Sequence, residues 1–151
     1  MVDRFGRFSL ALFEISRHWY RLAGDEMARY GLKAPHAIYL TALYRSENGL
    51  TGPELSRQCG RDKSDVSRTL AALEEKGFVR KEAVNGSLYR GLLRLTEAGR
   101  AAAEHVCLRA SQVVEQAGRD LTAETRALFY ESLESIAAHL REMEKEGASQ
   151  R

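Results

Sequence analysis

The chain has 151 residues, of which 44% are hydrophobic and 29% are charged, and its formal net charge is +2. This composition is typical of a globular protein with its own hydrophobic core. No apolar run approaches the roughly 20 residues of a membrane-spanning helix, and the N-terminal sequence lacks the pattern of a secretion signal. We therefore expect a single cytoplasmic domain, residues 1–151, that has no membrane partner.

Positive charge is concentrated in the middle of the chain. Residues 57–94 carry nine Lys or Arg and five acidic side chains, which gives this segment a net charge of +4. Residues 1–56 have a net charge of +1, and residues 95–151 have a net charge of −3. Binding to a polyanion such as nucleic acid requires an asymmetry of this kind, although an ordinary solvated surface can have a similar balance.

Long amphipathic helices are predicted at both ends of the chain. Apolar residues spaced four, three, four and three apart predict one helix over residues 4–30, ending at Gly31, and another that starts at Thr122. The first set is Phe8, Leu12, Ile15, Trp19 and Leu22, and the last set is Phe129, Leu133, Ile136, Leu140 and Met143. A further long helix is expected to begin at Thr96, and residues 147–151 are expected to form a disordered tail.

Shorter helices are predicted between these long ones. A proline in the first turn favours a helix over residues 35–45. Thr51 can cap the next helix, which ends before Gly60, and Asp62 can cap the following helix, which ends before Gly77. A short helix closed by a glycine turn and followed by a second helix is suited to insertion into the major groove of DNA.

A β-hairpin follows the last of these helices. Asn85-Gly86 is a strong turn signal between two expected strands, residues 78–84 and 88–95. The predicted fold is therefore mainly α with a small β-hairpin wing. Residues 34–95 are expected to form a winged helix-turn-helix unit.

The helices outside this unit have two interpretations. Residues 1–33 and 96–146 each contain an apolar stripe, and small side chains in the second segment permit close helix approach. These helices can pack on the middle unit of the same chain, or they can form a helical dimerisation platform. We favour the platform, because a protein that reads two DNA half-sites needs a homodimer.

Four short segments follow one another in the second and third quarters of the chain. They are Leu50-Thr51 with Glu54-Leu55, Asp62-Lys63-Ser64 with Val66-Ser67-Arg68, Leu73 to Val79, and Leu95 to Gly99. In this order and spacing they resemble the MarR family of winged helix-turn-helix transcription regulators. The resemblance covers nearly the whole chain and implies an obligate homodimer with interleaved terminal helices. It also implies binding to a palindromic operator in double-stranded DNA, commonly by a repressor that a small ligand releases.

The start of the helix that follows Asp62 carries the candidate DNA-binding side chains. Lys63 and Ser64 lie at its N-terminus, where backbone N–H groups and the helix dipole favour a phosphate. Ser67 and Arg68 can reach base edges, and Arg68 can make a bidentate contact with guanine. Asp65 either satisfies the helix end or accepts from a cytosine amine, because a carboxylate otherwise repels phosphates.

The wing departs from the pattern that the resemblance implies. Regulators of this family often carry an Asp-x-Arg element near the wing tip, whose Arg enters the minor groove. The corresponding positions here are Ser87 and Tyr89, so the element is absent. Arg90 is the nearest substitute, although strand alternation places it on the opposite face from Tyr89. Further contacts with the DNA backbone are expected from Arg80, Lys81 and Arg94.

An effector site follows from the resemblance alone. In similar proteins a small ligand binds between the dimer platform and the winged unit, and an aromatic or phenolic compound would suit the side chains near that junction. These side chains are Trp19, Tyr20, Tyr30, His36 and Tyr39. Each of them can also be an ordinary core or interface residue.

Other functions find little support in the sequence. Cys59 occupies an apolar position, and His105 and Cys107 are two residues apart, which does not place them on one helix face. We expect no metal site and no cofactor. The sequence has no phosphate-binding glycine loop, nucleophile elbow or His-Glu-x-x-His motif, so we do not expect an enzyme. The alternative to a DNA-binding regulator is a helical protein–protein interaction module without DNA binding.

Overall fold

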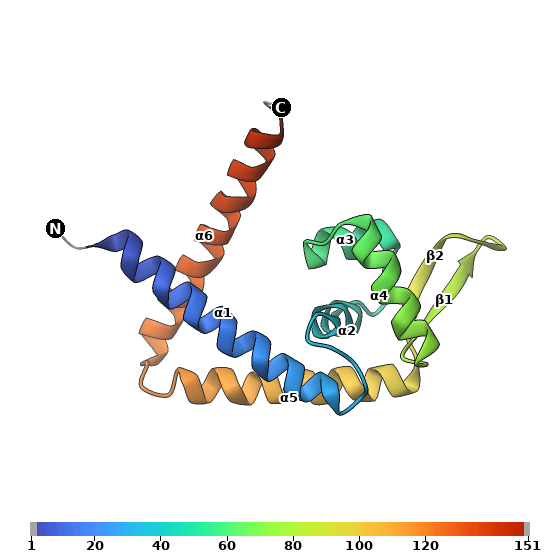
Figure 1. Ribbon diagram of the computed structural model, residues 1–151, viewed down its shortest axis with the longest axis horizontal. Helices are drawn as coiled ribbons and strands as arrows, with labels where there is room; N and C mark the ends of the chain where they lie inside the picture. The colour runs from blue at the N-terminus through green and yellow to red at the C-terminus, as the bar shows by residue number, and fades with distance from the viewer. Residues whose placement is uncertain (1–2, 150–151) are drawn as a thin grey trace. The chain divides into compact units, whose positions relative to one another are not determined.

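The computed structural model describes residues 3–149, without the side chains of residues 88–90. Within these residues, six helices and one antiparallel hairpin follow one another, as Figure 1 shows. They are α1 (Arg4–Ala28), α2 (His36–Arg45), α3 (Gly52–Cys59), α4 (Lys63–Glu75), β1 (Val79–Val84), β2 (Ser87–Leu95), α5 (Glu97–Ala117) and α6 (Ala123–Ser149). The prediction of a mainly helical fold with a small hairpin is confirmed.

The chain forms two compact units, residues 1–110 and residues 111–151, and their boundary lies inside α5. This boundary differs from the division that we expected, in which residues 34–95 stood apart from residues 1–33 and 96–146. Those expected functional segments remain predictions.

Local capping signals explain where α3 and α4 begin. Thr51 and Glu54 form a reciprocal capping box at the start of α3, and Gly60 ends this helix in the left-handed conformation with φ of 61°. The Asp62 side chain accepts a hydrogen bond of 2.8 Å from the backbone N–H of Asp65 at the start of α4. Both caps are the ones that the sequence predicts.

The first helix is two residues shorter than predicted. It ends at Ala28, because Gly31 adopts a left-handed φ of 66° and the N–H of Leu32 turns back to the carbonyl of Met27 at 3.0 Å. Tyr30 therefore lies in the turn after the helix. A glycine in this conformation satisfies the last carbonyls of a helix and stops it.

The hairpin turn forms as predicted. Asn85 and Gly86 have φ of 53° and 78°, and two consecutive positive φ values are typical of the tight turns that join twisted strands. The strands pair from Val79 opposite Leu95, and Leu93 also forms an isolated bridge with Leu50. This bridge ties the loop before α3 to the base of the hairpin, and no local pattern in the sequence predicts it.

A single cluster of apolar side chains forms the core of the first unit. Its buried members come from α1 to α5, from both strands and from the loops that flank α2: Met27, Leu32, Tyr39, Leu40, Leu43, Leu50, Leu55, Cys59, Val66, Leu73, Val79, Leu93, Ala102, Ala103 and Val106. One face of α4 lies in this core, so that helix is held firmly while its other face stays exposed.

The start of α5 packs tightly against the segment between α4 and β1. Thr96 donates from its hydroxyl to the Gly77 carbonyl at 2.6 Å, and its backbone N–H donates to the Phe78 carbonyl at 3.0 Å. A Cβ added at Gly99 would lie 1.9 Å from the Phe78 carbonyl oxygen. Only glycine fits at this position. The close contact explains why a glycine follows Thr96 by three residues at the start of α5.

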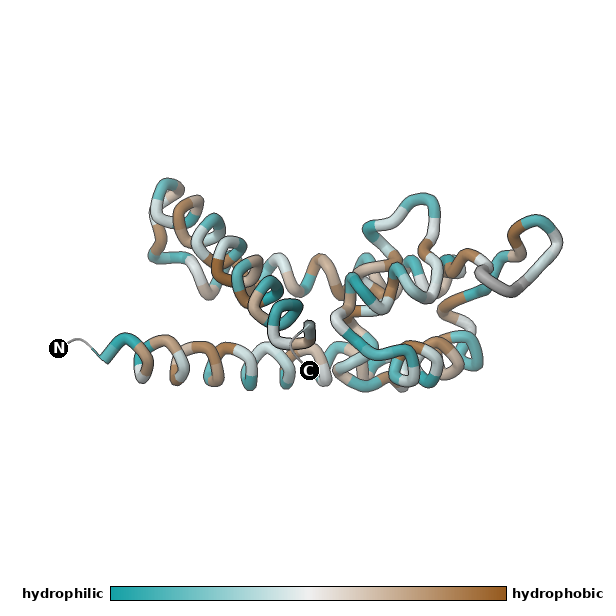
Figure 2. Tube along the Cα trace, turned by 90° about the horizontal axis from the view of Figure 1, so that it is seen from above, coloured by the Kyte–Doolittle hydropathy of each residue, from teal (hydrophilic) through white to brown (hydrophobic). Residues whose placement is uncertain are grey.

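The long helices α1 and α6 keep most of their large apolar side chains exposed in this single chain. The exposed set on α1 includes Phe5, Phe8, Leu10, Leu12, Phe13, Ile15, Trp19, Tyr20 and Leu22, and on α6 it includes Leu128, Phe129, Tyr130, Leu133, Ile136, Leu140 and Met143. Figure 2 shows the apolar residues recurring along the helix that starts at the N-terminus.

The second unit comprises the end of α5, the turn after it and α6. The guanidinium of Arg126 pairs with Glu115 at 3.0 Å and donates to the Gly118 carbonyl at 2.9 Å, so it joins the two helices beside the turn. The expectation of a disordered tail over residues 147–151 is wrong for residues 147–149, because α6 continues to Ser149. Strong helix formers precede these residues and carry the helix past Gly147, and residues 150–151 lie outside the described chain.

Candidate nucleic-acid interface

The first two turns of α4 present a polar surface. Lys63, Ser64, Ser67 and Arg68 are all exposed there. Val66 and Leu73 lie on the opposite face with 4% and 0% exposure, which anchors α4 in the core. The exposed side of this helix is therefore the one that the sequence predicts. Its N-terminus also offers backbone N–H groups and a positive dipole end to an anion.

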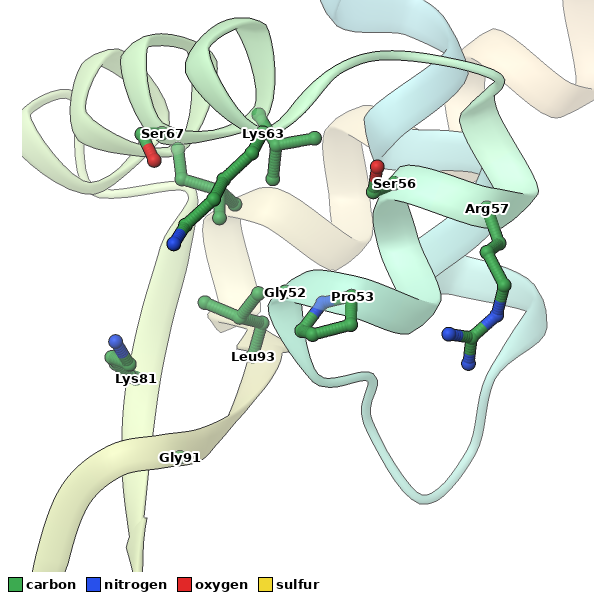
Figure 3. A pocket seen from close by; sticks show the side chains of 11 residues that line it. Gly52, Pro53, Ser56, Arg57, Lys63, Ser67, Lys81, Gly91 and Leu93 are labelled. Atoms are coloured by element: carbon green, nitrogen blue, oxygen red, sulfur yellow. The ribbon is translucent and has the colours of Figure 1, made fainter. Parts of the chain in front are cut away.

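A groove of about 630 Å³ runs beside this surface, between α3, α4 and the hairpin. Lys63 and Ser67 line it from α4, Lys81 lines it from β1, and Arg57 lines it from α3. Figure 3 shows Lys63 and Lys81 extending into the same opening, whereas the side chain of Arg57 points away from them on the other side of α3. Two cationic side chains, from α4 and β1, thus extend into the same groove, and Arg57 adds a third positive charge at its edge, which gives a local positive field suited to a polyanion.

Arg57 is the member of this group that sequence reasoning missed. It is exposed on α3, two residues before the buried Cys59. From the sequence it contributes only to the positive charge of residues 57–94 and is not predicted as a DNA-binding residue. The signal that could have found it is its place on the polar side of a short helix that directly precedes α4.

Asp65 has a different environment from its polar neighbours on α4. Its Oδ2 accepts a hydrogen bond of 2.6 Å from the hydroxyl of Tyr39, and its Oδ1 lies 4.0 Å from Nη2 of Arg68. Both carboxylate oxygens therefore face groups of the protein. These contacts favour a structural role for Asp65 at the start of α4 over a direct contact with a cytosine amine.

The basic side chains of the hairpin differ in whether other groups of the protein already engage them. The side chain of Lys81 is exposed and reaches the groove, whereas Arg80 has Glu82 within 4.0 Å. Arg94 pairs with Glu82 and also donates to the Glu47 carbonyl at 3.0 Å, so its guanidinium holds the base of the wing. The side chain of Arg90 lies outside the described part of the structure, and its proposed contact stays a prediction.

The five residues suggested for an effector site have dissimilar surroundings. Trp19 and Tyr20 are exposed on α1, whereas Tyr39 is completely buried and bonded to α4. Tyr30 packs edge-on against Phe78, with ring centroids 6.0 Å apart. His36 accepts from the N–H of Lys33 at 2.9 Å through Nδ1, and burial together with the charges of nearby lysines lowers its pKa.

Residues 3–149 bring no three potential metal ligands together in one place. None of the helices in that range combines the length and the apolar character of a membrane span. Cys59 is 6% exposed, as predicted for a packing residue, and burial raises the pKa of its thiol to about 11. A thiol with that pKa stays protonated at neutral pH and is a poor nucleophile.

The arrangement of α2 to α4 with the hairpin defines a winged helix-turn-helix, whose second helix presents a polar, partly cationic surface beside a basic groove. A sequence profile of the MarR family matches residues 30–86. No curated protein matches the sequence significantly.

Solved structures share this fold over nearly their full length. The crystal structure of MarR is 26% identical, covers 97% of this chain and 99% of its own, and has a TM-score of 0.77. A MarR transcriptional regulator from Methanosarcina mazei Go1 is 22% identical, with coverage of 90% and 97% and a TM-score of 0.79. MepR of S. aureus, in a structure described as a MepR-DNA complex, is 19% identical, with coverage of 87% and 97% and a TM-score of 0.77. The chain is therefore similar to the MarR family in its winged helix-turn-helix segment and shares the fold of solved MarR-type regulators.

Proposed function

We propose that this chain is a sequence-specific regulator that binds a palindromic operator in double-stranded DNA as a homodimer and acts in the cytoplasm as a repressor. The observation that carries the proposal is the exposed face of α4, where Lys63, Ser64, Ser67 and Arg68 stand beside the groove lined by Lys81 and Arg57. The similar fold of MepR, which was solved with DNA, supports the same conclusion.

The homodimer is supported by the uncovered apolar side chains of α1 and α6. Side chains such as Phe13 and Ile15 on α1 are 70% and 61% exposed, and Leu140 on α6 is 50% exposed. Large contiguous apolar patches are rare on monomeric proteins and mark interaction sites. A second copy of the chain would cover them and would place two α4 helices on successive half-sites.

Release of the operator by a small aromatic or phenolic ligand is the regulatory part of the proposal. Trp19, Tyr20, Tyr30 and His36 offer aromatic surface. His105 lies beside Tyr30, and Arg109 pairs with Glu26 of α1. We place the ligand near these residues because the resemblance implies a site at that junction. The test is whether an aromatic acid such as salicylate lowers the affinity for a selected operator without unfolding the protein.

The experiment that tests the function is selection of bound fragments from random DNA by the full chain. An inverted repeat whose half-sites are centred about one helical turn apart is the expected product. Affinity for that operator should fall steeply with salt, with a slope near −0.9 for each neutralised phosphate. The double variant K63A/R68A should lose binding, while K145A, which removes an exposed lysine of α6, should retain it.

The competing function is a helical interaction module. If neither selection nor salt titration detects binding to any duplex while the protein is folded, the chain acts through protein partners and the proposal is wrong.

A further inference from the structure

A buried tyrosine reaches the start of α4 from α2. Tyr39 is completely buried, and its hydroxyl donates to Oδ2 of Asp65 at 2.6 Å, across 26 residues of sequence. Burial and this hydrogen bond raise the pKa of Tyr39 to about 12. The hydroxyl therefore keeps its proton at neutral pH and serves as a donor to the carboxylate.

The carboxylate of Asp65 is held from more than one direction. The backbone N–H of the same residue is bonded to Oδ1 of Asp62 at 2.8 Å, which fixes the first turn of α4. Oδ2 of Asp65 accepts from the Tyr39 hydroxyl, and its Oδ1 lies 4.0 Å from Nη2 of Arg68, about one turn further along the helix. Tyr39, Asp65 and Arg68 thus form a continuous line from the core to the exposed face of α4.

Arg68 needs such a restraint more than its neighbours do. Its side chain is 76% exposed, so without a partner it samples many rotamers, and ordering it on a base costs conformational entropy. A carboxylate that attracts one edge of the guanidinium restricts this freedom, and the remaining N–H groups stay available for the N7 and O6 of guanine.

We propose that Tyr39 and Asp65 are positioning residues that orient Arg68 for reading a guanine in the operator. This inference rests on the proposed function, because it concerns how the same surface selects its sequence. It assigns to Asp65 a role through Arg68 rather than a direct contact with cytosine. Tyr39 supplies the fixed point, since it belongs to the rigid core and not to the surface.

The test is the variant Y39F, which removes one hydroxyl, leaves the ring in the core and does not change the net charge. The measured quantity is the guanine preference, which is the Kd for the operator with the contacted guanine replaced by adenine divided by the Kd for the selected operator. R68A should remove the guanine preference at the base that Arg68 contacts, and this loss identifies that base. Y39F should reduce the ratio about three- to tenfold, within the range of coupling between neighbouring residues, and should leave the salt slope unchanged.

The matched control is Y44F, which removes a hydroxyl from the same helix. The ring of Tyr44 lies below the guanidinium of Arg100, 5.8 Å from its Cζ, and Tyr44 has no part in the line to Arg68. Y44F should keep the wild-type ratio. The double variant Y39F/R68A should behave as R68A does, because Y39F acts only through Arg68.

The outcomes separate this inference from the proposed function. If the wild-type chain prefers no sequence, the proposed function fails and the inference fails with it. If the wild-type chain prefers the operator and folded Y39F keeps the full guanine preference, the positioning role alone is refuted. If Y39F does not fold, D65N decides: loss of guanine preference supports the role of Asp65, and an unchanged preference overturns it.

Discussion

Oε2 of Glu26, near the end of α1, lies 3.0 Å from Nε2 of His105 on α5. Oε1 of the same carboxylate accepts from Nε of Arg109 at 3.2 Å, and Arg29, directly after α1, pairs with Oε2 at 3.3 Å. Burial raises the pKa of Glu26, but the hydrogen bonds from His105 and Arg109 and the charge of Arg29 outweigh that effect, so its pKa is lowered from 4.5. The ionised carboxylate joins the first helix to the fifth.

The first prediction is that this link makes folding stability depend on pH in the acid range. Because the pKa of Glu26 is lower in the folded than in the unfolded chain, its contribution is complete above pH 4.5 and is lost as the pH falls through the folded value. E26Q should cost about 1 kcal/mol at pH 7 and should flatten the decline between neutral and acid pH. Urea unfolding at several pH values measures both effects. The control is E14Q at an exposed position on α1, and equal pH profiles for E26Q and the wild type would refute the link.

A second prediction concerns the contact between Gly99 and the Phe78 carbonyl. In G99A the new methyl group would stand 1.9 Å from that oxygen, so the backbone at the start of α5 must move. We expect G99A to destabilise the protein by about 3 kcal/mol, at the upper end of the cost of overpacking. Gly52 provides the control, since nothing lies within 4 Å of a Cβ placed there, and G52A should change the free energy of unfolding little. Thermal unfolding of the two variants compares them, and equal midpoints would contradict the packing argument.

Short-range signals in the sequence were sufficient for most of the fold. Thr51, Asp62 and the Asn85-Gly86 turn each act through bonds to residues two or three positions away, so their structures follow from local geometry. The end of α1 was missed by two residues for a similar local reason, because the turn at Gly31 begins before the glycine itself.

Long-range contacts are what the sequence could not reveal. The bond between Tyr39 and Asp65 joins residues 26 positions apart, and the pairing of Arg94 with Glu82 and the Glu47 carbonyl depends on how the hairpin docks on the loop before α3. A residue pattern shows that Asp65 can face solvent, but only packing decides what it meets. For that reason the sequence indicated which face of α4 is exposed and left the role of Asp65 open.

The third prediction is that Lys81 contributes to affinity but not to sequence preference. Its exposed side chain lies in the groove beside Lys63, on the hairpin rather than on the helix, which suits a contact with a phosphate. K81A should weaken binding to all duplexes by a similar factor and reduce the magnitude of the salt slope by about 1. Fluorescence anisotropy with the operator and with an unrelated duplex at several salt concentrations measures this. A loss confined to the operator would show that Lys81 reads bases instead.

A fourth prediction separates Arg94 from Lys81. The guanidinium of Arg94 is engaged by Glu82 and by the Glu47 carbonyl, so its removal should loosen the base of the wing. R94A should lower the free energy of unfolding by about 1 kcal/mol, the typical net value of a hydrogen bond, while K81A should leave it unchanged. Denaturant titration compares the two variants. If R94A keeps wild-type stability and instead lowers the salt slope of DNA binding, Arg94 is a phosphate contact.

The last prediction tests the dimer through α6. Leu133 and Ile136 are 42% and 39% exposed in the single chain, and in the proposed homodimer they would be covered by the second copy. L133D or I136D would then bury a carboxylate among apolar side chains, at a cost on the order of 3 kcal/mol or more for each subunit. Sedimentation should show monomers or weaker dimers, with operator affinity reduced in parallel. S135D adds the same charge to another side of the helix and should leave the dimer intact. A stable dimer of folded L133D would exclude this face of α6 from the interface.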